Sequence, residues 1–259
     1  MRSGTDLQTR LDDGALWLTL NRPHVFNALS PEMADDIARL LEEAVARDEV
    51  RVVVVTGTGA AFSTGADISG DNAHENFDVR AMDAANRIIR AVVGLDKPVV
   101  AAVNGIAAGV GCSAALASDI VIAAESASFL LAFARIGFMP DGGASATVAA
   151  SIGRARAMRM GLLAEPLSAQ EAYDAGLVTH LAPDAEFPAL VEKIVRRLAA
   201  GPPLALAATK RAINAATLTQ LDPALERERT GQSLLMRTAD VAEGMRAFTE
   251  HRRPVFRGE

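Results

Sequence analysis

Two features of this chain suit chemistry on a carbonyl compound: a glycine-rich helix start and a single acid in apolar surroundings. The helix start follows the turn Asn104-Gly105 and reads Gly109-Val110-Gly111 before an alanine-rich segment. The first N–H groups of a helix have no partner within it and lie at the positive end of its dipole. The acid is Asp141, in the segment FMPDGG. Together they predict enolate chemistry, in which N–H donors hold a negative oxygen and the acid moves a proton.

Asp141 also has a purely structural interpretation, since an aspartate ahead of a helix is a favoured N-cap and a helix is expected to begin near Gly142. Other reactive side chains are weaker candidates. Cys112 lies beside the glycine turn and is interpreted as a packing residue. The four histidines are far apart and none has metal-ligand spacing, so no metal site is predicted; they are His24, His74, His180 and His251.

The elements that position these residues alternate between strands and helices, which indicates an α/β fold with largely parallel strands. Strands are expected at Ala15–Asn21, Val52–Val55 and Pro98–Val103. A helix is expected after Ser30-Pro31, with Ser30 as its N-cap and an apolar stripe at helical spacing. The stripe consists of Met33, Ile37, Leu40, Leu41, Ala44 and Val45. A second helix is expected near Val79–Val93, after an irregular loop at Gly70–Phe77.

The second half of the chain is predicted to be mainly helical. Ser168 and Glu171 form a capping box. Helices are expected at Phe187–Ala199, Pro203–Ala216, Pro223–Met236 and Ala239–Thr249. We therefore expect an α/β core over residues 1–200 that binds the substrate. A helical region over 201–259 is expected to serve oligomerisation and to cover the site.

Composition excludes several classes of protein. The 259 residues are half hydrophobic, with few aromatics, so one large core of small side chains is expected. The net charge of −6 argues against nucleic-acid binding. A single cysteine fits a reducing compartment, and no segment predicts a signal peptide or a membrane span, so a cytoplasmic location is expected.

Several stretches, in one order over nearly the whole chain, together resemble the crotonase (enoyl-CoA hydratase/isomerase) superfamily. They are LNRPHVFNAL, VVVTGTGAAFSTGADI, KPVVAAVNGIAAGVGCSAALASDIVIAAESASF, RIGFMPDGG, AYDAGLV and EGMRAFTEHRRPVF. The resemblance implies a spiral of strand–strand–helix repeats with a helical C-terminal region. It also implies assembly as homotrimers or dimers of trimers, and acyl-CoA thioesters as substrates, with no separate cofactor because coenzyme A is part of the substrate.

The resemblance also implies an oxyanion hole formed by the N–H groups of Ala66 and Val110. Each such donor is typically worth roughly 3 kcal/mol in the transition state. Val110 replaces the glycine that many members have. The implied coenzyme A and acyl contacts are Arg22, Val25, Ala28, Ala66, Asp67, Ile68, Gly109, Phe133, Met139 and Lys210. Arg252 and Arg253 are further phosphate candidates, Phe248 is a candidate for packing near the nucleotide, and Phe77 and Met82 are candidates for the acyl pocket. Each of these side chains is also compatible with an ordinary surface or core role.

The sequence departs from the family pattern where hydratases carry two glutamates that activate water. Ser113 and Phe133 occupy those positions, and neither is a competent base. RIGFMPDGG resembles members that move double bonds within acyl-CoA chains, including the 3-enoyl/2-enoyl isomerases and the phenylacetate-pathway ring isomerases. In those members the acid at this place shuttles a proton. We therefore expect an enoyl-CoA isomerase that uses Asp141. The alternatives are an enoyl-CoA hydratase, with Asp141 or Glu75 activating water, and a catalytically weak acyl-CoA-binding protein.

Overall fold

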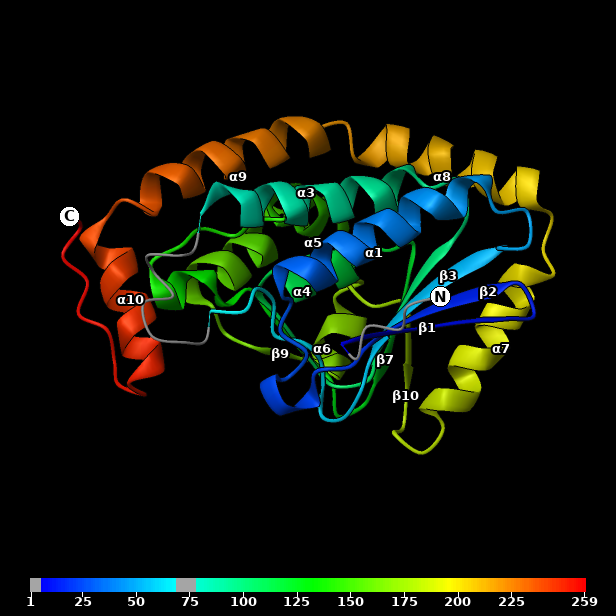
Figure 1. Cartoon of the computed structure of the whole chain (residues 1–259), viewed down its shortest axis with the longest axis horizontal. Coiled ribbons are helices and arrows are strands. Elements are labelled where there is room, and N and C mark those ends of the chain that lie inside the picture. Colours follow the sequence, from blue (N-terminus) through cyan, green and yellow to red (C-terminus); the bar gives the residue numbers. More distant parts are fainter. Residues whose placement is uncertain (1–5, 69–77) are drawn as a thin grey trace.

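The computed structural model describes residues 6–68 and 78–259 and contains two β-sheets covered by helices (Figure 1). The larger sheet has six strands in the order β1-β2-β3-β5-β7-β10. Their bounds are Leu7–Asp12, Ala15–Leu20, Val52–Gly57, Val99–Val103, Ile120–Ala124 and His180–Ala182. β1 and β2 form an antiparallel hairpin, and the other neighbours run parallel. The predicted irregular loop Gly70–Phe77, with His74 and Glu75, lies outside the described residues.

The smaller sheet has four short strands in the order β4-β6-β8-β9. Their bounds are Ala61–Ser63, Ile106–Ala108, Ser128–Leu130 and Leu167–Ser168. Strands β3, β5 and β7 of the large sheet are each followed along the chain by β4, β6 or β8 of the small sheet. A helix then follows each pair: α3 (Val79–Gly94), α4 (Gly109–Leu116) and α5 (Ala144–Leu163). This succession confirms the predicted spiral of strand–strand–helix repeats.

Helices cover both faces of the large sheet. Val53 of β3 packs with α1 (Pro31–Glu43) and α3 on one face, whereas Val52 and Val54 pack with α7 (Phe187–Ala199) on the other. Successive side chains of a strand point to opposite faces, so a run of valines buried on both sides is what this position requires. α1 and α3 lie alongside each other above the sheet, with α7 at its opposite side (Figure 1).

The predicted helix starts are confirmed by their caps. The Ser30 hydroxyl accepts a hydrogen bond from the Met33 N–H, and Pro31 is the first residue of α1. Ser168 and Glu171 form the predicted capping box of α6 (Ala169–Asp174). Val45 is a wrong prediction, because α1 ends at Glu43 and a short 3₁₀ turn, η2 (Ala44–Ala46), leaves this side chain 61% exposed.

Three helices complete the chain after α7: α8 (Pro203–Thr217), α9 (Leu221–Leu235) and α10 (Ala239–Thr249). They agree with the expected helices to within two residues at each end. α9 packs on α3 and α5, and α10 packs on the 3₁₀ turn η3 (Ala132–Ile136). Within the described ranges, no helix is both long and apolar enough to cross a membrane.

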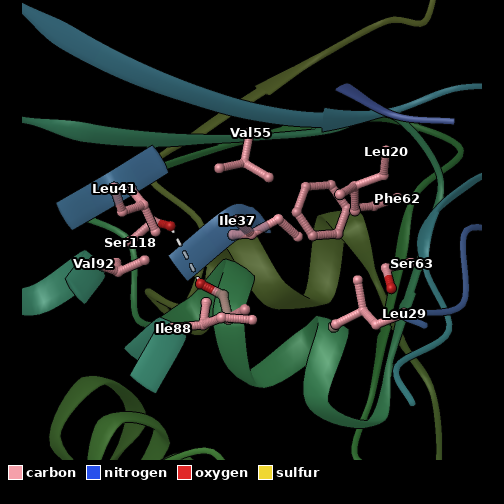
Figure 2. A pocket seen from close by; sticks show the side chains of 12 residues that line it. Leu20, Leu29, Ile37, Leu41, Val55, Phe62, Ser63, Ile88, Val92 and Ser118 are labelled. Atoms are coloured by element: carbon pink, nitrogen blue, oxygen red, sulfur yellow. Dashed lines mark hydrogen bonds between the residues drawn. The ribbon is translucent and has the colours of Figure 1, made fainter. Parts of the chain in front are cut away.

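A small cavity of about 30 Å³ remains where α1, α3 and α4 meet β3 (Figure 2). Apart from Ser63 and Ser118, the residues that line it are apolar or glycine. A cavity of this size is too small for an acyl group, and its lining offers water few polar partners. The substrate site must therefore lie elsewhere.

Candidate active site

A cavity of about 510 Å³ lies where the loop after β4 meets the start of α4, the turn η3 and the helices α3, α9 and α10. Most of the predicted site residues line it: Val25, Ala28, Ala66, Asp67, Ile68, Gly109, Val110, Phe133 and Asp141. Met82 and Phe248 line it as well. This volume is in the range of small-molecule sites, and the lining is mostly apolar with few polar groups.

The two residues whose backbone N–H groups are predicted to form an oxyanion hole, Ala66 and Val110, border this cavity. Val110 is the second residue of α4, so its N–H lies in the first helical turn, where the helix supplies no acceptor. Ala66 forms a parallel bridge with Leu29 that uses the Gly65 carbonyl and the Asp67 N–H. The N–H of Ala66 therefore points away from Leu29. Both residues line the cavity.

Gly65 brings these two segments into contact. Its φ is +93°, and a Cβ built there would lie 3.0 Å from the Val110 nitrogen and 3.1 Å from the Ala108 oxygen. A side chain at this position would push the two loops apart. The loop is held from behind by Ser63, whose buried hydroxyl accepts from the Gly65 N–H at 3.1 Å and donates to the Asn27 carbonyl at 2.8 Å.

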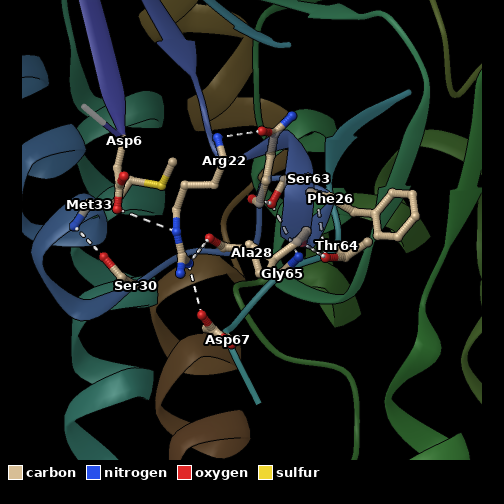
Figure 3. A network of polar contacts seen from close by, with 12 residues as sticks. Asp6, Arg22, Phe26, Ala28, Ser30, Met33, Ser63, Thr64, Gly65 and Asp67 are labelled. Atoms are coloured by element: carbon tan, nitrogen blue, oxygen red, sulfur yellow. Dashed lines mark hydrogen bonds and ion pairs between the residues drawn. The ribbon is translucent and has the colours of Figure 1, made fainter. Parts of the chain in front are cut away.

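Arg22 supports the same loop without lining the cavity. Its Nη1 donates to Asp67 Oδ2 at 2.8 Å and to the Ala28 carbonyl at 2.7 Å, and Asp6 lies 3.4 Å from its Nε (Figure 3). The Asn27 amide oxygen accepts from the Arg22 N–H at 2.8 Å. Arg22 is therefore a support of the cavity wall, and its charge is already shared with two acids.

Asp141 lies in the cavity wall with 5% of its surface exposed. Oδ2 accepts from Gln232 Nε2 at 2.9 Å, and Oδ1 is buried with no hydrogen-bond partner among residues 6–68 and 78–259. Burial raises the pKa of this carboxyl from 3.8 to about 7; the Gln232 hydrogen bond lowers it and the nearby Glu228 raises it. A buried acid with a free oxygen and a near-neutral pKa is a good candidate for proton transfer.

The structure does not support the N-cap interpretation of Asp141. α5 begins at Ala144, and its cap residue is Gly143 with φ +73°. Glu228 of α9 occupies the position of a cap instead: its carboxylate accepts from the N–H groups of Gly143 at 2.7 Å and Ser145 at 3.0 Å. The Asp141 side chain therefore caps no helix, and Asp141 is part of the cavity lining.

Glu228 and Gln232 are the site residues that sequence reasoning missed. Both are buried, with 0% and 1% of their surfaces exposed. Their signal lies in the helical spacing of α9, where Leu221 and Leu225 form an inward stripe that Glu228 and Gln232 continue. Polar residues on a buried stripe need partners, and here the partners belong to the Asp141 turn.

The two positions that carry glutamates in the hydratase pattern hold no base. Ser113 is fully buried, and its hydroxyl donates to the Asp141 carbonyl at 2.7 Å. This hydrogen bond, together with Gly142 packed on Ser113 and Val110, ties the Asp141 turn to the first turns of α4. Phe133 lines the cavity with an apolar ring.

Two predicted contacts are corrected by the structure. Lys210 is buried on α8; its ammonium pairs with Asp119 at 2.8 Å and donates to the Val92 and Lys97 carbonyls. These three partners leave it no free donor for a phosphate. Met139 is absent from the cavity lining, since its sulfur packs against Gly231 of α9.

The remaining reactive side chains play no part in this cavity. The Cys112 thiol is buried and burial raises its pKa to about 12, which supports the packing role. His24, His180 and His251 are absent from its lining. Arg252 pairs with Glu243 and Glu250 on α10 and the tail. Among the described residues, no group of three histidine, cysteine, aspartate or glutamate side chains could hold a metal ion.

A second cavity, of about 660 Å³, borders the first and shares Ala66, Asp67 and Val110 with it. It lies between α1 and α3. Its acids are Asp35, Asp67, Asp78 and Asp83, and its arginines are Arg80 and Arg87. Both arginines are paired with acids, Arg80 with Asp78 and Arg87 with Glu42 and Asp35.

Comparison with known proteins gives consistent matches over nearly the full length. The enoyl-CoA hydratase/isomerase family model matches residues 11–259. A probable enoyl-CoA hydratase from Rhodobacter capsulatus is 40% identical, covering 97% of this chain and 98% of the relative. The 1,2-epoxyphenylacetyl-CoA isomerase of Escherichia coli is 37% identical, with coverages of 97% and 98%.

Solved structures agree with these matches. The crystal structure of an enoyl-CoA hydratase from Mycobacterium avium subsp. paratuberculosis K-10 superposes with a TM-score of 0.91 at 50% identity, covering 97% of this chain and 98% of that one. The family match, the relatives and the two-sheet fold with its oxyanion-type loops support one conclusion. This chain belongs to the enoyl-CoA hydratase/isomerase (crotonase) family of acyl-CoA enzymes.

Proposed function

We propose that this enzyme moves a double bond within an enoyl-CoA, from the 3-position to the 2-position. The observation that carries the proposal is the free oxygen of one buried acid, Asp141 Oδ1, beside two oxyanion-type N–H groups. Asp67 also lines the cavity, but Arg22 holds its carboxylate in an ion pair. An allylic shift needs a single acid, whereas the family's hydration mechanism uses two.

The proposed mechanism uses the residues as follows. The thioester oxygen accepts hydrogen bonds from the N–H groups of Ala66 and Val110. Asp141 Oδ1 takes a proton from C2. The electron pair of the broken C–H bond becomes the π bond between C1 and C2, and the π pair of the thioester C=O moves onto the oxygen, which gives a dienolate. The two N–H donors stabilise the negative oxygen of this intermediate. Asp141 then returns the proton to C4, which leaves the double bond between C2 and C3.

The apolar surroundings support the same reaction. Phe133, Phe138 and Met82 line the cavity around the acid. Low polarity strengthens the interaction of the dienolate with its donors and disfavours competing water. It also keeps the pKa of Asp141 near 7, so the side chain exists in both protonation states near neutral pH.

Hydration of a 2-enoyl-CoA is the second candidate, favoured by the names of similar proteins. The Rhodobacter capsulatus relative and the Mycobacterium avium structure are both described as enoyl-CoA hydratases. In this chain the reaction would require Asp141, or Glu75 outside the described residues, to activate water, because Ser113 is committed to the Asp141 carbonyl and Phe133 is apolar.

The deciding experiment offers 3-enoyl-CoA and trans-2-enoyl-CoA separately to the wild type and to Asp141→Asn. We expect ultraviolet absorbance of the conjugated thioester to appear from the 3-enoyl substrate. The Asn variant should lose about 10²–10⁴-fold in rate, the usual contribution of a general base. Asp174→Asn, which changes an exposed acid on α6, is the matched control and should retain full activity.

Two other outcomes would contradict the proposal. Loss of the 2-enoyl absorbance with formation of hydroxyacyl-CoA would identify a hydratase. Binding of both thioesters without turnover, over a series of acyl chain lengths, would favour the catalytically weak acyl-CoA-binding protein.

We also propose that the chain assembles as a homotrimer or a dimer of trimers through its C-terminal half. Large apolar side chains are exposed there, among them Leu162, Leu163, Leu204, Leu234 and Phe256. Patches of exposed apolar surface mark interfaces. Sedimentation equilibrium should give a mass near three or six times the 27.1 kDa of the chain; a monomer would contradict this proposal.

A further inference from the structure

Gln232 makes an unusual set of contacts for a side chain that is 1% exposed. Its Nε2 donates to the Met139 carbonyl at 2.8 Å and to Asp141 Oδ2 at 2.9 Å, and its Oε1 accepts from the Met139 N–H at 3.3 Å. One amide therefore joins α9 to both the backbone and the acid of the turn 139–141.

The paired contacts with Met139 fix which way the amide points. The Met139 N–H can only donate, so it must face the amide oxygen, and the Met139 carbonyl can only accept, so it must face the nitrogen. The second hydrogen of Nε2 is then directed at Asp141. A rotated amide would place two acceptors or two donors face to face at Met139, which costs free energy in a buried position.

We propose that Gln232 is a positioning residue that gives the two oxygens of Asp141 different tasks. Oδ2 is the anchor, held by Gln232, and Oδ1 is the atom that takes and returns the proton. This inference rests on the proposed function. The contacts distinguish the two oxygens, since Oδ2 already accepts a hydrogen bond and Oδ1 has no partner in the described part of the chain.

One charged group acts on the Asp141 carboxyl, and a second lines the same cavity. Glu228, one turn before Gln232 on α9, adds a negative charge that favours protonated Asp141, whereas the Gln232 hydrogen bond favours the ionised form. Arg135 lines the same cavity from η3, and its Nε and Nη2 both donate to the Ala164 carbonyl. Removing the Gln232 donor should therefore raise the pKa of Asp141, and removing the Glu228 charge should lower it.

The test measures the titration of the Asp141 carboxyl directly by ¹³C NMR of aspartate-labelled protein, with Asp141→Asn to assign the signal. In Gln232→Met we expect the Asp141 titration and the acidic limb of kcat/KM to move together to higher pH. We expect kcat near neutral pH to fall about tenfold or more, with KM nearly unchanged. Glu228→Gln should move the titration in the opposite direction, which general structural damage would not do.

Gln170→Met is the matched control. Gln170 donates to Asp174 at 2.9 Å on the exposed surface of α6, so this variant removes a similar hydrogen bond away from the cavity. Its kinetics and the Asp141 titration should equal those of the wild type. If Gln232→Met fails to fold by circular dichroism, Gln232→Glu takes its place. Glutamate keeps the side-chain length but puts a second acid beside Asp141, so the Asp141 titration should again move to higher pH.

An Asp141 titration that is the same in the folded Gln232 variant and in the wild type would overturn the inference. Failure of the proposed function is read from the substrate assay instead: it would appear as hydration, as binding without turnover, or as isomerisation that survives Asp141→Asn.

Discussion

At the residue scale, Asp141 is expected to cost the folded protein stability. Its carboxyl has a pKa of about 7 in the folded chain and 3.8 as its ordinary value. Between these pH values the folded state binds more protons than the unfolded state. The free energy of unfolding therefore falls as pH rises through this window, and the loss is complete above it.

This linkage predicts that Asp141→Asn, the variant expected to lose activity, is more stable than the wild type. The neutral amide avoids burying a charge, so at about pH 8 it should unfold with a free energy higher by ~2 kcal/mol. The difference should shrink towards zero as the pH falls to about 3, where the wild-type carboxyl is largely protonated in both states. Urea unfolding of both proteins at the two pH values measures this difference in the free energy of unfolding. A gap of equal size at both would show that ionisation of Asp141 is not its cause.

At the element scale, the oxyanion geometry depends on how closely the loop after β4 approaches the start of α4. Gly65→Ala adds a Cβ 3.0 Å from the Val110 nitrogen, so we expect a loss of roughly 10²–10³-fold in kcat, the size of a lost oxyanion donor. Gly176→Ala is the matched control: it has a similar φ of +83°, but its Cβ would meet nothing within 4 Å.

Steady-state kinetics and thermal unfolding of both glycine variants separate the two effects. Gly176→Ala should lose about 1 kcal/mol of stability, because alanine is strained at positive φ. Gly65→Ala should lose more, because its Cβ also meets backbone atoms. Only Gly65→Ala should lose activity. Equal activities in the two variants would contradict the placement of the oxyanion hole between Ala66 and Val110.

The elements differ in how far the sequence predicts them. Helices such as α7 and α10 agree with their predicted bounds, because local signals determine them: periodicity in both, a proline in the first turn of α7, and the Thr238 cap of α10. The strands of the smaller sheet have two or three residues each, and such short segments carry little periodicity of their own. Their pairing comes from the spiral of the whole chain, so the sequence alone did not indicate them.

The candidate site, like the fold, was predictable where local motifs determine it and not where distant segments meet. The residues on local motifs, Asp141, Ala66 and Val110, meet at one cavity as expected. Gln232 was missed because its contact with Asp141 spans 91 residues, and no local pattern gives the register of α9 against the turn. Lys210 was wrongly predicted as a phosphate contact because basic residues near the C-terminus often lie on the surface. Its burial beside Asp119 depends on how α8 packs on the core, which no local pattern shows.

At the scale of the whole molecule, Lys210 and Asp119 join the helical region to the core. Asp119 also accepts from the Val99 N–H, at the start of β5. Burial raises the pKa of Asp119 and lowers that of Lys210, so each charge depends on the other. A buried pair that loses one partner leaves an uncompensated charge, which is strongly destabilising.

We therefore predict that Lys210→Met destabilises the protein by roughly 3–5 kcal/mol and leaves KM for the acyl-CoA unchanged. Arg211→Met is the control on the same helix. It removes an exposed pair with Asp96 and should cost less than about 1 kcal/mol. Chemical unfolding and kinetics of the two variants give both quantities. A large rise in KM without loss of stability would restore Lys210 as a coenzyme A contact.

The cap that Glu228 provides for α5 also sets an order of assembly. The Gly143 N–H obtains its acceptor from a residue 85 positions later in the chain, and the Asp141 turn obtains its anchor from the same helix. A ribosome has already released both sheets and their covering helices by the time α9 emerges. The strands of the central spiral can thus pair before α9 is available, because their contacts span fewer residues than those of α9 with the Asp141 turn. We therefore predict that a chain halted before α9 forms its two sheets but lacks the anchor that the proposed function assigns to Asp141.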